Sequence, residues 1–135
     1  MSDNELEKIR QKKAEMLLKM QSMPREIINI KSEQELTNLT KQFSDKIIII
    51  DFWAVWCSPC KMFAPTFEKL HQEYYRDFIF AKINVDENPL IAQYLGISSI
   101  PTTVFLQNNQ VLRKFVGVMN YGTLKQIFEK FKKHA

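Results

Sequence analysis

The only two cysteines of the 135-residue sequence, Cys57 and Cys60, stand three positions apart with Pro59 between them. They directly follow the apolar run "IIIIDFWAVW", which is typical of a buried strand. If a helix begins at about Ser58, Pro59 occupies its first turn, where a missing N–H costs nothing. The positive end of the helix dipole then favours the thiolate form, and only a thiolate attacks a disulfide. The spacing therefore predicts Cys57 as a nucleophile and Cys60 as the thiol that resolves the mixed disulfide.

Two other interpretations of the cysteines remain open at this point. A CxxC pair is half of a zinc site, but a structural zinc needs four ligands and the sequence offers only the distant His71 and His134. We therefore expect no metal. The pair could also be two inert buried thiols, although a position at a helix start argues against inertness.

Asp51 is the one charged residue in an otherwise apolar strand. A carboxyl group in such a strand is desolvated, which raises its pKa and suits it to exchange a proton near neutrality. The alternative is that Asp51 stands at the strand end and reaches water.

Charge and composition exclude several classes of protein. The net charge is +4, and six Lys or Arg residues follow position 112 while Glu129 is the only acidic residue there. Lysines at the end of a final helix, where the helix dipole favours positive charge, explain this basic C-terminal segment better than a nucleic-acid site does. No apolar run reaches the roughly 18 residues of a spanning helix, so we expect no membrane association. The charged start "MSDNELEKIRQKKAE" has no apolar region of a signal peptide, which predicts a cytoplasmic location.

Strand and helix patterns alternate along the chain, which predicts an α/β fold. The sheet is expected to be parallel first and antiparallel at its far edge, with helices on both faces. The expected strands cover 26–30, 46–53, 78–85, 102–107 and 111–117, and the expected helices cover 32–43, 58–76, 87–96 and the last residues of the chain. Asn108 and Asn109 predict a hairpin between the last two strands.

Residues 3–23 form a separate amphipathic pattern that ends at Pro24. Ser2 and Glu5 have the spacing of a capping box. We divide the chain into an N-terminal helical extension, 1–24, and a domain, 25–135. The narrow apolar stripe of this helix could bind a partner or lie in solvent, but packing on its own domain is favoured. The stripe consists of Leu6, Ile9, Met16, Met20 and Met23.

The block "IIIIDFWAVWCSPCKMFAPTFEKL" resembles the active-site segment of the thioredoxin family. The resemblance continues in "AKINVDENP", "GISSIPTTVFLQN" and "VGVMNYGTLKQIF", and covers about residues 26–133. It implies the thioredoxin fold, with a central mixed five-stranded sheet flanked by helices. It also implies a protein disulfide reductase without a cofactor, which cycles between dithiol and disulfide and is recharged by a thioredoxin reductase. We expect a monomer whose other partners are disulfide-containing proteins.

The resemblance also assigns roles to residues. Cys57 matches the exposed nucleophile and Cys60 the buried resolving thiol, with Asp51 accepting the Cys60 proton and Lys82 near that carboxylate. Pro101 matches a cis proline that faces the cysteines across a substrate groove, with the Ile100 backbone free to pair with a peptide. The rim of the groove is expected to contain Trp56, Pro59, Ile100 and Val118, with Gly117 beside it.

Two positions depart from the family pattern. Ser58 replaces the usual glycine between the cysteines, which leaves the reduction potential open, and Val55 replaces a common glutamate. A glutaredoxin-like or oxidase-like member of the same fold is one alternative function. A binding module without redox activity is another.

Overall fold

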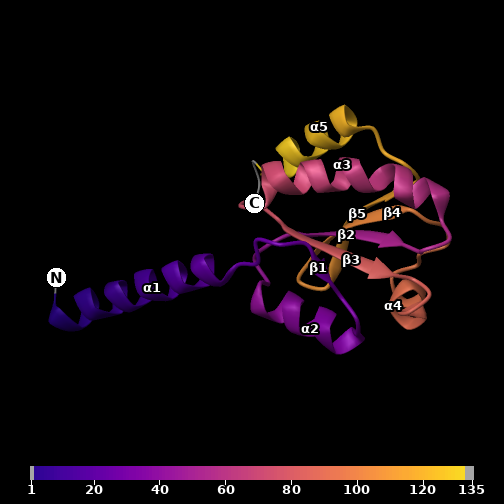
Figure 1. Ribbon diagram of the computed structural model, residues 1–135. Helices are drawn as coiled ribbons and strands as arrows, with labels where there is room; N and C mark the ends of the chain where they lie inside the picture. The colour runs from indigo at the N-terminus through magenta and orange to yellow at the C-terminus, as the bar shows by residue number, and fades with distance from the viewer. Residues whose placement is uncertain (1, 133–135) are drawn as a thin grey trace.

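Five strands form one mixed sheet in the order β1-β3-β2-β4-β5 (Figure 1). The computed structural model describes residues 2–132, with side chains for 2–17 and 23–132. Strands β1, β3 and β2 are parallel, whereas β4 is antiparallel to β2 and β5 is antiparallel to β4. The strands are β1 (Ile28–Asn29), β2 (Ile48–Trp53), β3 (Ile79–Asn84), β4 (Thr102–Gln107) and β5 (Gln110–Val116). The predicted α/β fold and its mixed sheet are confirmed.

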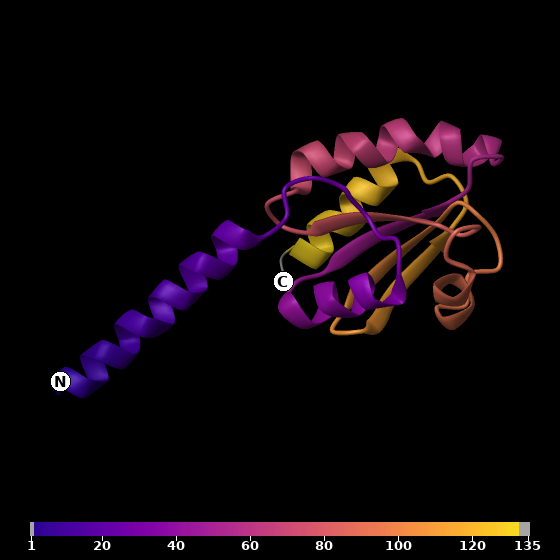
Figure 2. The same cartoon turned by 60° about the horizontal axis from the view of Figure 1, so that its bottom comes forward.

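The central strands are buried on both faces because helices cover the sheet on each side (Figures 1 and 2). Helices α3 (Ser58–Tyr74) and α5 (Tyr121–Lys132) cover one face, and α2 (Glu33–Gln42) and α4 (Pro89–Tyr94) cover the other. This double burial explains why β2 and β3 are apolar at both odd and even positions.

Local signals at the ends of elements agree with the sequence. The Ser32 side chain accepts a hydrogen bond from the Glu35 backbone N–H at 3.1 Å and caps α2. Asn108 and Asn109 both adopt positive φ, as a two-residue hairpin turn between β4 and β5 requires. Strand β1 is shorter than predicted, because only two of its residues pair in register with β3 at this edge of the sheet.

Helix α1 (Asp3–Ser22) projects away from the rest of the molecule (Figure 2). The Ser2 hydroxyl caps its start by accepting from the Glu5 N–H at 3.2 Å. Leu6, Ile9 and Met16 are exposed, so the prediction that this helix packs on its own domain was wrong. The apolar stripe of this helix is narrow and charged residues interrupt it, so the helix has no continuous apolar face to pack against the domain. Met23, after the helix, does pack against the core, whereas the Met20 side chain lies outside the described residues.

Within residues 2–132, no helix combines the length and the apolar character needed to cross a membrane.

Candidate functional site

Cys57 and Cys60 form a disulfide at the junction between β2 and α3. Their Cα atoms are 5.3 Å apart, within the normal range for a disulfide. Cys57 is the N-cap residue of α3, and Pro59 lies in the first turn, where the sequence placed it. The pair is therefore in its oxidised state at the start of a 17-residue helix.

The start of α3 stabilises negative charge on the sulfur of Cys57. The Cys57 Sγ accepts the backbone N–H of Cys60 at 3.2 Å, as an N-cap side chain does. A thiolate at this position gains from that hydrogen bond and from the helix dipole. The local geometry therefore lowers the cost of forming a Cys57 thiolate.

The two sulfurs differ in the cavity that each residue lines rather than in exposed area. Cys57 is only 3% exposed and Cys60 4%, so the expectation of an exposed Cys57 was wrong. Neighbouring side chains cover most of Cys57, but it still lines an open groove of about 620 Å³. Cys60 lines a different, smaller cavity of about 190 Å³, whose lining includes the exposed Val55 and Lys61. The two cysteines therefore line separate cavities, Cys57 beside the segment before β4 and Cys60 beside Asp51.

The groove beside Cys57 is mostly apolar and is bounded by the segment before β4. The Ile100–Pro101 peptide bond is cis, as the resemblance implies, and the Ile100 carbonyl oxygen lies 3.9 Å from the Cys57 Sγ. Trp56 is 70% exposed, and its Nε1 donates to Asp86 Oδ2 at 2.8 Å, which holds the indole in place. The residues that line the groove are Trp56, Cys57, Ser58, Pro59, Val85, Ile97, Ser98, Ser99 and Ile100.

Gly117 and Val118 do not line this groove, although the sequence placed them beside it. The Gly117 N–H donates to the Pro101 carbonyl at 2.7 Å, so the glycine adjoins the cis proline. A Cβ atom on Gly117 would meet no atom within 4 Å, but φ there is +93°, which favours glycine.

Sequence reasoning missed four groove residues, and some of them could have been found. Ser98 and Ser99 belong to the same loop as Pro101, in "GISSIP". Val85 follows β3, and the carboxyl ends of neighbouring parallel strands meet at the same sheet edge, where Cys57 also lies. Ile97 has no comparable signal.

Asp51 lies under the cysteines in β2 and is 1% exposed, so it does not reach water as a strand-end residue would. Burial raises its pKa from 3.8 to about 6, while the positive charge of Lys82 opposes part of that effect. Lys82 is the neighbour of Asp51 in the parallel pairing of β2 with β3, and both line the smaller cavity with Cys60. The carboxyl group is thus poised to exchange protons near neutral pH.

No group of three metal-ligating side chains gathers anywhere in the described part of the chain. His71 Nε2 lies 2.6 Å from the carbonyl oxygen of Arg25, on a different part of α3 from the cysteines. His134 lies outside the described residues. The described residues therefore offer no zinc site around the CxxC pair.

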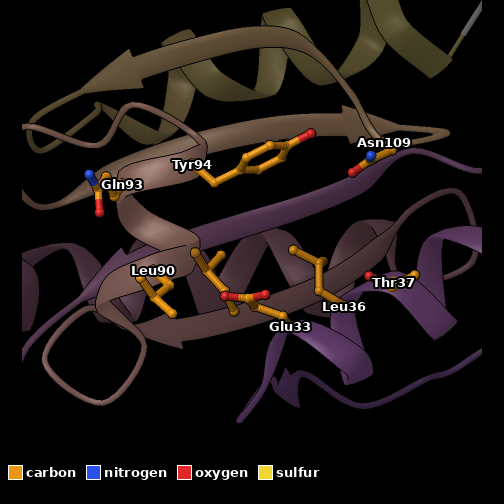
Figure 3. Close-up of a pocket in the computed structure, with 8 residues that line it drawn as sticks. Glu33, Leu36, Thr37, Leu90, Gln93, Tyr94 and Asn109 are labelled. Atoms are coloured by element: carbon orange, nitrogen blue, oxygen red, sulfur yellow. The ribbon is translucent and has the colours of Figure 1, made fainter.

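A second pocket, of about 560 Å³, lies between α2, α4 and the β4–β5 turn (Figure 3). Leu90 and Tyr94 of α4 and side chains of α2 line this pocket, with Asn109 of the β4–β5 turn near one end, whereas Gln93 lies on the far side of α4 from α2. None of the site residues predicted from the sequence lines it.

The family model for thioredoxin matches residues 26–130. A thioredoxin of Chlorobaculum thiosulfatiphilum is 47% identical over 76 residues, which cover 56% of this chain and 70% of the relative. Thioredoxin 1 of Nostoc sp. is 41% identical over 87 residues, which cover 64% of this chain and 81% of the relative.

Solved structures of thioredoxins also resemble this chain. The Malassezia sympodialis thioredoxin matches with a TM-score of 0.73 and 36% identity, over 79% of this chain and 91% of that one. The reduced Schistosoma mansoni thioredoxin pre-protein matches with a TM-score of 0.71 and 34% identity, over 78% of this chain and 98% of that one. With its CxxC disulfide at the start of α3, the chain belongs to the thioredoxin family of disulfide oxidoreductases.

Proposed function

We propose that the protein carries electron pairs in the cytoplasm, reducing disulfides of other proteins and being recharged by a thioredoxin reductase. The observation that carries this proposal is the Cys57–Cys60 disulfide, with Cys57 lining an open groove and Cys60 lining a smaller cavity together with a buried acid. A scaffold used only for binding has no need of an acid buried beside the sulfurs.

In the first step, the Cys57 thiolate of the reduced protein attacks one sulfur of a target disulfide. The target S–S bond breaks, a bond forms between Cys57 Sγ and the attacked sulfur, and the other target sulfur leaves as a thiolate that takes a proton. The N–H of Cys60 and the dipole of α3 favour the attacking thiolate.

In the second step, Cys60 resolves the mixed disulfide. The Cys60 thiol gives its proton to the Asp51 carboxylate, and the resulting thiolate attacks Cys57 Sγ. The bond between Cys57 and the target breaks, the second target sulfur leaves, and the Cys57–Cys60 disulfide forms. The target has gained two electrons, and the protein is left in the oxidised state described above.

The groove supports recognition of an extended peptide around the target cysteine. We propose that the Ile100 backbone pairs with that peptide while Trp56 and Pro59 contact its apolar side chains. Gly117, and Val118, which is partly exposed, would bound a longer peptide beyond the groove. Lys82 moderates the charge of Asp51, and Pro101 positions Ile100 facing Cys57.

We further propose that residues 25–135 form the functional domain, that 1–24 are an extension, and that the protein works as a monomer. The exposed side chains of α1 support the division of the chain.

Reduction of insulin by dithiothreitol, followed as turbidity, tests the activity. The wild type should accelerate precipitation of the insulin chains, and a protein that gave no acceleration would contradict the proposal. A thioredoxin reductase should reduce the disulfide, whereas reduction by glutathione and a glutathione reductase alone would favour a glutaredoxin-like role.

The roles of the two cysteines are tested separately with single serine variants. Cys60→Ser should accumulate mixed disulfides with target proteins, because nothing resolves them, and Cys57→Ser should accumulate none. If Cys57→Ser trapped targets instead, the assignment of nucleophile and resolving thiol would be reversed.

A further inference from the structure

Two buried polar atoms near the cysteines have no hydrogen-bond partner among the described residues: Asp51 Oδ1 and Thr103 Oγ1. Both residues are almost completely enclosed, with Asp51 at 1% and Thr103 at 0% exposure. Unpaired buried polar groups are rare and costly in folded proteins, so a pair of them calls for an explanation.

The two groups are direct neighbours across the sheet. Asp51 of β2 pairs in register with Thr103 of β4 on one side and with Lys82 of β3 on the other. Side chains that are opposite each other in an antiparallel pair lie on the same face, with Cβ atoms about 5 Å apart. The hydroxyl and the carboxyl group therefore lie within reach of each other after a small rotation of either side chain.

This polar row lies on the face of the sheet that α3 and α5 cover. The adjacent row on the same strands, two residues earlier in β2, consists of Phe80, Ile49 and Phe105, all apolar and buried. The hydroxyl of Thr103 is thus an exception in an apolar layer, at the position in β4 that lies beside the buried acid.

We propose that Thr103 is a positioning residue for the Asp51 proton shuttle, its hydroxyl donating a hydrogen bond to the ionised carboxylate and keeping it ready to accept the Cys60 proton. The inference rests on the proposed role of Asp51. A hydroxyl can donate to a carboxylate, and a hydrogen bond to a charged oxygen is about twice as strong as one between neutral groups. Thr103 keeps its own proton throughout; the transferred proton moves from Cys60 Sγ to Asp51.

Other groups that can donate a hydrogen bond line the same cavity as Asp51, and none of them makes a hydrogen bond to Asp51 Oδ1 among the described residues. Lys82 acts on Asp51 through its charge from β3, and Cys60 and Lys61 line the cavity from α3. The remaining residues that line this cavity are uncharged: Trp53, Ala54, Val55 and Ala64. Strand β4 contributes Thr103 as the partner of Asp51 in the sheet.

The test uses Thr103→Val, which keeps the shape of the side chain and removes the hydroxyl, and Thr103→Ser, which keeps the hydroxyl. The full-length reduced protein is mixed with an aromatic disulfide that releases a coloured thiolate, and release of the second thiolate reports the attack by Cys60. Rates are measured from pH 5 to 9, and carbon-13 NMR of the Asp51 carboxyl group gives its pKa directly.

We expect the pKa of Asp51 to be about one unit higher in Thr103→Val than in the wild type, because the ionised form loses its donor. Resolution should then slow about fivefold at the pH where half of the wild-type carboxyl groups are ionised, since only about a tenth of them are ionised there in the variant, and the two rates should match at pH 9. Thr103→Ser should restore the wild-type profile. Thr40→Val is the matched control, because Thr40 is a buried threonine in α2 whose hydroxyl donates to the Thr37 carbonyl at 2.9 Å.

An unchanged pH profile in Thr103→Val, or slowing by the same factor at every pH, would overturn the role of Thr103. Asp51→Asn separates this result from a failure of the proposed mechanism. If Asp51→Asn resolves the mixed disulfide at the wild-type rate, Asp51 is not the shuttle and both proposals fail. If it is slow while Thr103→Val behaves as wild type, only the inference about Thr103 fails.

Discussion

At the scale of single residues, the site buries the carboxyl group of Asp51, where ionisation costs free energy because water is excluded. Asp51 is enclosed by β2, β3, β4 and α3, and burial raises its pKa to about 6. The folded state therefore holds the Asp51 proton more tightly than the unfolded state, whose carboxyl group has its ordinary pKa. Stability falls as the pH rises from about 4 to about 6, where the buried group becomes charged.

Asp51→Asn should therefore stabilise the protein at neutral and alkaline pH. A rise from 3.8 to about 6 corresponds to about 3 kcal/mol of folding free energy at pH 8, and the gain should vanish near pH 3.5, where both forms are neutral. Urea unfolding at several pH values measures it. A gain that did not depend on pH would show that the substitution acts through packing and not through charge.

Ser58 is the residue that departs from the family pattern between the cysteines. In the oxidised structure its side chain lines the groove, and its hydroxyl makes no hydrogen bond to either sulfur within the described part of the chain. The sequence left open how this residue affects the reduction potential.

We expect Ser58→Ala to change the reduction potential by less than about 30 mV, which is less than a tenfold change in the dithiol–disulfide equilibrium. Equilibration with a glutathione or dithiothreitol redox buffer measures the potential. A larger change would mean that the hydroxyl contacts the thiolate in the reduced state.

At the scale of elements, the position of the cysteines depends on how α3 is held on the sheet. Phe63 and Phe67 of α3 are fully buried, and an aromatic cluster joins α3 to α5 and the strands. Phe128 of α5 is its centre, because its ring makes edge-on contacts with Tyr74, Phe78 and Phe105 at centroid distances of 5.2 to 5.4 Å. Such pairs add to the stability that burial of apolar area supplies.

Phe128→Ala should leave a large cavity in this cluster and cost about 3 to 5 kcal/mol. In a chain of this size the loss lowers the melting temperature by about 10 to 20 °C, as calorimetry would measure. Tyr94→Ala in α4 is the comparison, because Tyr94 is 72% exposed and should change the melting temperature by only about 1 °C. Equal losses in the two variants would contradict the central place of Phe128.

At the scale of the whole molecule, α1 stands apart from the domain that carries the disulfide (Figure 2). The side chains of residues 2–17 are exposed, and Met23, after the helix, packs against the core.

A variant that lacks residues 1–17 should therefore unfold within about 2 °C of the full-length protein, because the described side chains of this segment are exposed and little buried apolar area is lost. Its rate of insulin reduction should also be unchanged, since α1 contributes no residue to the groove. Thermal unfolding and the turbidity assay check both. A much lower melting temperature would mean that α1 belongs to the fold.

The sequence by itself determined the order of the elements and the redox pair. Strands buried on both faces carry apolar residues at odd and even positions alike, the Asn108–Asn109 turn has a local signature, and a CxxC motif after a strand places its sulfurs at a helix start. These features depend on residues that are close in the chain, so the sequence pattern records them directly.

Only the tertiary structure decided what faces the sulfurs. The groove combines residues of three separate segments, and the pairing of Asp51 with Thr103 depends on the register between β2 and β4, which no local pattern specifies. The near-complete burial of Cys57 follows from packing between distant residues, whereas the described side chains of α1 are exposed and do not pack on the domain. The sequence therefore identifies the reactive cysteines and the helix start that carries them. The surroundings that set the reactivity of these groups form only when strands that are distant in the chain pair and exclude water.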